Sequence, residues 1–258
     1  MSYPIIPGAE SISVTEGSEG AVLLLHGFMG TVQLVHDWAL AFAQAGFAVE
    51  APLLPGHGTS ALDLEQTRWA DYVVCAEEYY QKLAARYERV FIAGACTGGM
   101  LAAWTALNHL DTVAGLMIAN GFFILPKHWN IGFVQEMIQT DRRFFPWFGS
   151  RTVENPDAPA LIVYEQTPTS SFLSIRDGCR DILPRLGEIT CPSIVFTSAL
   201  DKVVPPQYTR QWSDKFSGPV EHVMLERSGH LATFDYDKGI IEDRSIEFAR
   251  ALARSEAA

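Results

Sequence analysis

The sequence is short of positive charge and of long apolar runs. Its 258 residues contain 19 Lys and Arg against 30 Asp and Glu, a formal net charge of −11. Nucleic acids and anionic membrane surfaces both attract basic faces, so this balance argues against either as a partner. The apolar runs, such as residues 21–25, are far shorter than the roughly 20 residues that span a bilayer. We therefore expect no membrane span.

Cysteine is also scarce. Only four cysteines are present, none of them in a C-x-x-C pair, and no histidine cluster has the spacing of zinc ligands. The sequence therefore predicts no metal site. Few cysteines without a pattern are typical of a reducing compartment, and residues 1–8 lack a basic segment followed by an apolar one. We expect a cytoplasmic protein, with Cys75, Cys179 and Cys191 as buried filler.

Short apolar runs alternate with amphipathic stretches along most of the chain. The runs that predict strands are 22–25, 47–50, 90–93, 113–119, 194–197 and 220–225. The stretches that predict helices are 35–45, 69–87, 100–109, 208–216 and 240–253. This alternation favours an α/β fold with a mostly parallel sheet covered by helices on both faces. Such sheets bind ligands at the carboxyl ends of their strands.

Residues 121–180 interrupt this rhythm and are unusually aromatic. They hold ten of the chain's aromatic residues, which number 6 Trp, 8 Tyr and 15 Phe in all. We interpret the segment as a small cap inserted into a core of residues 1–120 and 181–258. Some of its aromatic side chains would form an apolar pocket wall, and the others would seal the cap to the core. The predicted substrate-binding residues are Phe28, Phe122, Phe123 and Phe133.

The strongest local signal is the sequence Gly94-Ala-Cys96-Thr-Gly98-Gly99, between a strand and an Ala-rich helix. This G-x-C-x-G-G pattern matches a nucleophile elbow with Cys where Ser is usual. Its tight turn forces strained backbone angles on residue 96, and side chains at 94 and 98 would collide with neighbouring backbone. The helix N-terminus and a nearby imidazolium would favour a thiolate. A tight turn around a buried thiol is the alternative.

A second motif, His26-Gly-Phe28-Met-Gly30, follows the first clear strand. In such a turn the backbone N–H of Phe28 points toward the nucleophile. Together with the N–H of Thr97 it predicts an oxyanion hole with two donors. His26 is then expected to hold the loop and not to act as the base.

Asp201 and His230 each follow a later strand, so both belong to the same edge of the sheet as Cys96. The order Cys, Asp, His is the chain order of α/β-hydrolase triads. It predicts that His230 takes the proton from Cys96, while Asp201 fixes the imidazole tautomer and stabilises the imidazolium. An Asp after a strand is usually only a turn or cap residue, so the prediction depends on all three residues together.

The chain resembles a carboxylesterase or monoacylglycerol lipase of the α/β-hydrolase superfamily, nearly from end to end. The matching segments are 26–31, 52–59, the elbow, 164–168, 189–192, 201–205 and 228–230. The resemblance implies the α/β-hydrolase fold and hydrolysis of acyl esters through a covalent acyl-enzyme, without a cofactor. It also implies short-to-medium acyl esters or monoglycerides as substrates, and a structural role for His57.

The family's nucleophile is Ser, and Cys96 departs from it. A natural thiol enzyme, an engineered Ser-to-Cys replacement and a degenerate site that only binds ligand would all look alike at this position. Retention of Asp201, His230 and both oxyanion elements argues against degeneration. Dienelactone hydrolases also carry G-x-C-x-G-G, and a thioester intermediate would suit an acyltransferase or a thioesterase as well. The expected partner is a small-molecule acyl ester or thioester.

Overall fold

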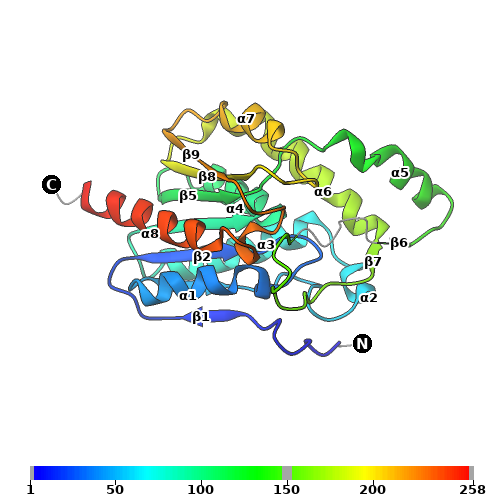
Figure 1. Ribbon diagram of the computed structural model, residues 1–258, viewed down its shortest axis with the longest axis horizontal. Helices are drawn as coiled ribbons and strands as arrows, with labels where there is room; N and C mark the ends of the chain where they lie inside the picture. The colour runs from blue at the N-terminus through cyan, green and yellow to red at the C-terminus, as the bar shows by residue number, and fades with distance from the viewer. Residues whose placement is uncertain (1–2, 147–152, 256–258) are drawn as a thin grey trace.

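The computed structural model describes residues 3–146 and 153–255, and its centre is a seven-stranded sheet (Figure 1). The strands are Ile12–Val14 (β1), Ala21–Leu25 (β2), Ala48–Ala51 (β3), Val90–Ala95 (β4), Val113–Ala119 (β5), Ser193–Ser198 (β8) and Val220–Leu225 (β9). They lie in the order β1-β3-β2-β4-β5-β8-β9. β1 pairs antiparallel with β3, and the other pairs are parallel. The predicted α/β fold with a mostly parallel sheet is confirmed.

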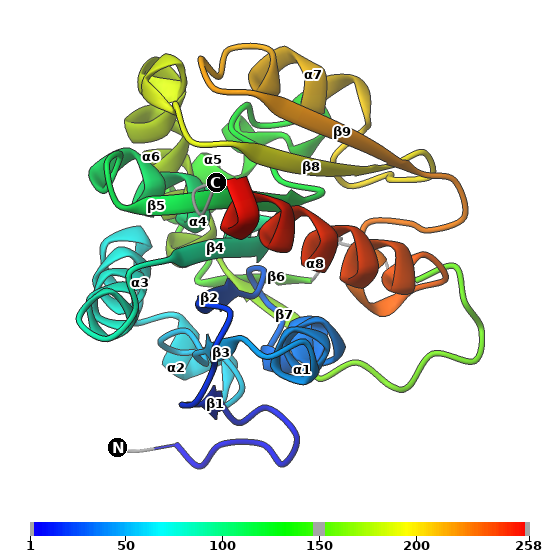
Figure 2. The ribbon, with the colours of Figure 1, turned by 90° about the vertical axis from the view of Figure 1, so that its left-hand side faces the viewer.

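Helices cover both faces of this sheet. The larger helices are His36–Gln44 (α1), Trp69–Ala84 (α3), Thr97–Asn108 (α4), Thr169–Ile182 (α6), Gln207–Ser213 (α7) and Lys238–Ser255 (α8). In Figure 2 α1 and α8 lie on one face, and α3, α4 and α6 lie on the other. The short helical turns of the core are Val32–Val35 (η1), Ala61–Leu64 (α2), Leu183–Glu188 (η3) and Ala232–Phe234 (η4).

The strands of this sheet other than the edge strand β1 contribute to two hydrophobic cores, because their side chains alternate between the faces. In β2, Leu23 and Leu25 belong to the core under α3 and α4, whereas Val22 and Leu24 belong to the core under α1 and α8. All five residues of β2 are buried. Burial on both faces explains why the central strands are continuous apolar runs, which is the pattern that made them predictable.

The segment 121–180 contains elements of two kinds. Its helices Lys127–Trp129 (η2) and Ile131–Gln139 (α5), with the hairpin Phe144–Pro146 (β6) and Gln166–Pro168 (β7), extend beyond the sheet in Figure 1. In contrast, α6 packs against α3 and α4 and crosses the predicted boundary at residue 180. The division into core and cap stays a proposal, and Trp147 and Phe148 lie outside the described residues. Among the helices of the described ranges, none combines the length and apolar character that a membrane crossing requires.

Candidate active site

The elbow places Cys96 between the end of β4 and the start of α4. Cys96 has φ 55° and ψ −121°, a backbone conformation that residues with a Cβ adopt rarely. A Cβ on Gly94 would stand 2.2 Å from the carbonyl oxygen of Gly98, and one on Gly98 would stand 1.9 Å from that of Leu25. Both glycines are therefore required by close backbone contact. The turn presents the thiol at the carboxyl end of the sheet.

Two backbone N–H groups stand beside Cys96 without an acceptor from the described part of the chain. They belong to Phe28 and to Thr97, the first residue of α4. A Cβ on Gly27 would lie 3.1 Å from the Cβ of Cys96, so the turn that carries Phe28 passes directly next to the nucleophile position. Preorganised N–H groups of this kind can meet a developing negative charge, and the oxyanion hole predicted from Phe28 and Thr97 stays a proposal.

His26 and His57 are buried histidines that hold the loops around this site. Nε2 of His26 accepts from the backbone N–H of Leu54 at 3.0 Å, and its Nδ1 lies 2.9 Å from the carbonyl oxygen of Gly27. Nδ1 of His57 lies 3.0 Å from the carbonyl oxygen of Pro55. Burial lowers the pKa of His26 to about 3 and that of His57 to about 4. Both rings are therefore neutral at pH 7, which suits a structural role in these loops.

Asp201 and His230 meet at the carboxyl ends of β8 and β9. Nδ1 of His230 lies 2.8 Å from Oδ2 of Asp201. Oδ1 of Asp201 accepts from the backbone N–H groups of Val203 and Val204, each at 2.8 Å. Asp201 is 4% exposed and His230 7% exposed. The carboxylate is thus fixed by its own loop and holds the imidazole by one nitrogen.

The charge on His230 depends on its two neighbours in the site. Burial by itself lowers the pKa of His230, but the charges of Asp201 and Cys96, with hydrogen bonds to both, raise it well above 6.5. A buried histidine whose pKa is raised in this way can accept a proton from its neighbour and hold it as an imidazolium beside Asp201. The three predicted side chains therefore form one coupled group.

Asn120 is a functional candidate that the sequence reasoning missed. It follows β5 with φ 48° and is 2% exposed. Its Nδ2 donates to Oγ of Ser198 and to the carbonyl oxygen of His230, both at 2.8 Å, and its Oδ1 accepts from the N–H of Ser198 at 2.8 Å. Asn120 thus ties the ends of β5 and β8 to the His230 loop. Its signal in the sequence is a polar residue directly after a buried strand.

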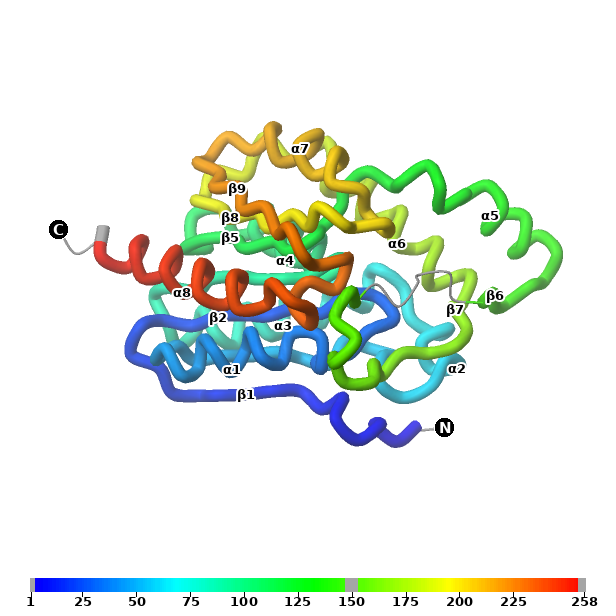
Figure 3. The backbone as a smooth tube through the Cα atoms, viewed as in Figure 1, coloured from blue at the N-terminus to red at the C-terminus, as the bar shows by residue number. Residues whose placement is uncertain are grey.

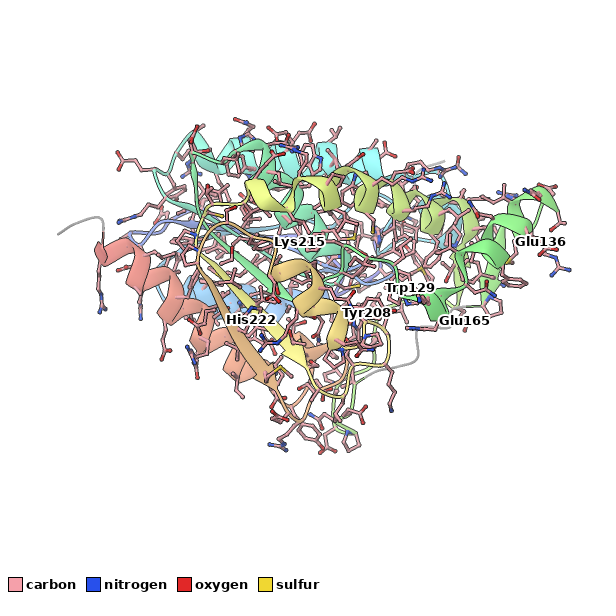
Figure 4. The ribbon with its side chains drawn as sticks, turned by 90° about the horizontal axis from the view of Figure 1, so that it is seen from above. Trp129, Glu136, Glu165, Tyr208, Lys215 and His222 are labelled. Carbon is pink, nitrogen blue, oxygen red and sulfur yellow. The ribbon has the colours of Figure 1, made fainter. Side chains whose placement is uncertain are left out.

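A cavity of about 390 Å³ opens onto Cys96 and His230. Its walls are mostly apolar and include Trp129, Phe133, Val134, Phe145, Phe172 and Ile175. Aromatic rings pack against one another along one wall. Phe172 lies edge-on to Phe145 with 5.5 Å between ring centroids, and tilted against Trp129 at 5.6 Å. Figure 4 shows Trp129 at the inner end of this region and Glu136 far out on α5. Such a cavity suits a small, largely apolar ligand.

Two of the four predicted pocket residues are in the wall, and two are not. Phe28 and Phe133 line the cavity. Phe122 and Phe123 were also predicted to bind substrate, but both are fully buried and neither lines the cavity. Phe122 packs edge-on against Trp129 and Phe123 against Trp212. Phe122 therefore supports the wall from behind through Trp129. Within residues 3–146 and 153–255, no three His, Cys, Asp or Glu side chains come together as metal ligands.

The sequence and the fold are both similar to those of known proteins. The family model Hydrolase_4, described as serine aminopeptidase, S33, matches residues 16–237. A thermostable monoacylglycerol lipase of Bacillus sp. (strain H-257) is 36% identical over 95% of this chain and 96% of its own. A solved structure from work on LipS and LipT, two metagenome-derived lipolytic enzymes, has a TM-score of 0.88 and 28% identity. That similarity covers 96% of this chain and all of the other.

The fold is also shared with more distant structures. A monoacylglycerol lipase of Paleococcus ferrophilus has a TM-score of 0.78 at 14% identity, covering 98% of this chain and all of its own. The chain belongs to the Hydrolase_4 family of α/β-hydrolases, whose solved relatives include lipases and esterases. The family description names serine, whereas this chain has Cys96 at the elbow.

Proposed function

We propose that this protein hydrolyses carboxylic esters, of short-to-medium acyl acids or monoacylglycerols, through a covalent acyl-enzyme on Cys96. The proposal rests on the observation that three features lie together at the mouth of an apolar cavity. They are a thiol on a strained elbow, a buried His230–Asp201 pair and two N–H donors. The names of the relatives, a monoacylglycerol lipase and lipolytic enzymes, favour esters as the substrate class.

The proposed reaction has two halves. Sγ of Cys96 attacks the ester carbonyl carbon, His230 accepts the thiol proton, and the oxyanion binds to the N–H groups of Phe28 and Thr97. The C–O bond to the alcohol then breaks, and His230 returns the proton to the leaving oxygen. Water attacks the resulting thioester while giving a proton to His230. Collapse of that intermediate releases the carboxylic acid and returns the thiol proton to Cys96.

The cavity supports an acyl group of modest size with an apolar body. Its walls carry few polar groups, so a substrate gains most of its binding free energy from apolar contact. The ester carbon has to sit next to Cys96, which places one part of the substrate along the aromatic wall of Trp129, Phe145 and Phe172. The other part would extend toward the opening.

An acyltransferase or thioesterase is the second candidate, and the thiol itself favours it. An alcohol or an amine can attack a thioester in competition with water. Product analysis with and without an added amine or alcohol separates the two functions. Transfer product in excess of free acid would reject simple hydrolysis.

The test of the proposed nucleophile is the mass of the intact protein after brief exposure to a chromogenic short-chain ester. We expect one added acyl group in the wild type and none in Cys96→Ala. The matched control is Cys75→Ala, which removes a half-buried thiol on α3 and should keep the adduct. Turnover that persists in Cys96→Ala would reject Cys96 as the nucleophile.

Cys96→Ser tests why the elbow carries a thiol. A natural thiol enzyme loses its activity on thioesters in this variant. Much higher esterase activity in the variant would instead indicate an altered serine site. A thiol nucleophile must also stay reduced, and all four cysteines are free, so we propose a location in the reducing cytoplasm.

A further inference from the structure

Asp235 is a buried carboxylate that the proposed reaction does not use. Its side chain accepts from four backbone N–H groups although the residue is only 2% exposed. Oδ2 accepts from Glu154 at 2.8 Å and from Gly229 at 3.0 Å. Oδ1 accepts from Asn155 at 2.9 Å and from Tyr236 at 2.8 Å. The carboxylate therefore joins two segments far apart in the sequence, residues 154–155 and the turn that precedes His230.

Residues 153–165, which we call the strap, lead from the contact with Asp235 to β7. In Figure 3 the strap passes the start of α1 and continues to β7. Gln33 binds it at two points, donating to the carbonyl oxygen of Ala160 and accepting from the N–H of Ile162, each at 2.9 Å. Tyr164 at its end donates to the carbonyl oxygen of Gly56 at 2.9 Å. The strap is thus bound along its length to loops of the core.

The start of the strap lies next to both loops that carry the proposed base and its partner. Asp235 binds it to Gly229, the neighbour of His230. The carboxylate of Glu154 is also 3.9 Å from Nζ of Lys202, the neighbour of Asp201. No described residue of the strap lines the cavity. Its contacts therefore reach the cavity through the loops of Lys202 and His230, which do line it.

The backbone at His230 is held from two directions. Asn120 donates to the carbonyl oxygens of Gly229 and His230, and Asp235 accepts from the N–H of Gly229. Loss of either hydrogen-bonding partner leaves a buried backbone group unpaired, which is unfavourable unless the turn moves. A turn that moves takes the imidazole of His230 with it.

We propose that Asp235 is a positioning residue for His230, and that it acts by binding the strap to the backbone of Gly229. The inference rests on the proposed function, because it takes His230 as the base that serves Cys96. An Asn side chain cannot replace this carboxylate. Whichever way it turns, its NH₂ group faces two N–H donors.

The experiment compares Asp235→Asn with Glu50→Gln in the full chain. Glu50 is the matched control, because it is also a buried carboxylate at 2% exposure but binds Ser13 and Lys82 instead of the site. Alkylation of Cys96 by iodoacetamide is followed against pH by mass spectrometry of the Cys96 peptide. Ester hydrolysis is measured in parallel as kcat and KM.

In Asp235→Asn we expect the alkylation curve to move to higher pH, because a displaced His230 stabilises the Cys96 thiolate less. We expect kcat to fall by about tenfold to a hundredfold, the effect of a small misplacement of a reacting group. KM should change less than kcat, because the strap does not line the cavity and only residues 230–233 of the displaced turn do. Asp235→Glu, which keeps both oxygens, should show smaller changes in the same direction, and Glu50→Gln none.

Amide exchange at residues 154 and 155 reports whether the strap is released. A folded Asp235→Asn protein with fast exchange there, but with the wild-type alkylation curve and kcat, would overturn the inference. If Asp235→Asn does not fold, Asp235→Glu decides by the same criteria. A shifted alkylation curve in a protein without any ester turnover would instead support the positioning role and reject the proposed function.

Discussion

Cys96, the proposed nucleophile, has a strained backbone. A non-glycine residue at φ 55° and ψ −121° persists only where its surroundings determine the conformation. Here the surroundings are the backbone contacts at Gly94 and Gly98, which leave no room for a Cβ. Those contacts follow from the residue pattern, so the elbow could be predicted from sequence.

His230 gives a prediction about stability against pH. Its pKa in the folded protein is raised well above 6.5, so the folded state binds the proton more tightly than the unfolded state. The resulting stabilisation is complete below pH 6.5 and is lost as pH rises through the raised pKa. We expect the difference in free energy of unfolding between wild type and His230→Gln to fall over that range, measured by denaturant titration at several pH values.

Cys96→Ala provides the control for this titration. The charge of Cys96 is one cause of the raised pKa of His230, so in this variant the fall should begin at lower pH. If the difference in free energy of unfolding between wild type and His230→Gln is the same at every pH, the raised pKa of His230 is contradicted.

The roles of Asn120 and Asp235 could not be predicted from the sequence. Each is a lone polar residue in a loop, without a motif around it. The role of Asn120 depends on Ser198 and His230, and that of Asp235 on residues 154 and 155. Such partners are distant in sequence and adjacent only in the folded chain, so no local pattern could reveal them.

Among the elements, those with strong periodicity were predictable and those with mixed composition were not. β5 and β9 match the predicted residues 113–119 and 220–225. β1 has only three residues, including Ser13, and pairs at the edge of the sheet, where burial imposes little pattern. α6 begins with Thr169, Ser170 and Ser171, which favour caps and turns over helix interiors. Its packing on α3 and α4 overrides that preference.

Phe172 on α6 gives a prediction about selectivity. Its ring contacts Phe28, Trp129 and Phe145, so it fills the centre of the aromatic wall. Phe172→Ala should widen the cavity and raise the ratio of kcat/KM for long over short acyl esters by about tenfold. The expected loss of stability is about 3 kcal/mol or less, because the ring is only partly buried.

Phe133→Ala is the comparison for Phe172→Ala. Phe133 also lines the cavity but is 45% exposed on α5, so its removal should change both selectivity and stability less. Steady-state kinetics with an acyl-chain series, together with thermal unfolding, measures both quantities. Equal kcat/KM ratios in Phe172→Ala and wild type would place the acyl chain elsewhere.

For the whole molecule, the net charge of −11 affects which substrates reach the site. A neutral ester feels little of this field, whereas an acyl group on an anionic carrier is repelled. We expect KM for an anionic thioester to fall as NaCl rises from 0.01 to 0.3 M, because the Debye length shrinks from about 30 Å to below 10 Å. KM for a neutral short-chain ester should stay constant. Initial rates at matched pH test this, and a salt response shared by both substrates would exclude long-range repulsion as its cause.

The parallel sheet also determines when the proposed nucleophile and the proposed base come together as the chain is synthesised. The nucleophile is at position 96 and the proposed base at position 230, a separation of 134 residues (230 − 96). Between them β5, β8 and β9 must pair in register before Asn120 can bind the His230 turn. Contacts so distant in sequence form late in folding. A nascent chain that has not yet reached residue 230 therefore carries the Cys96 thiol without the proposed base.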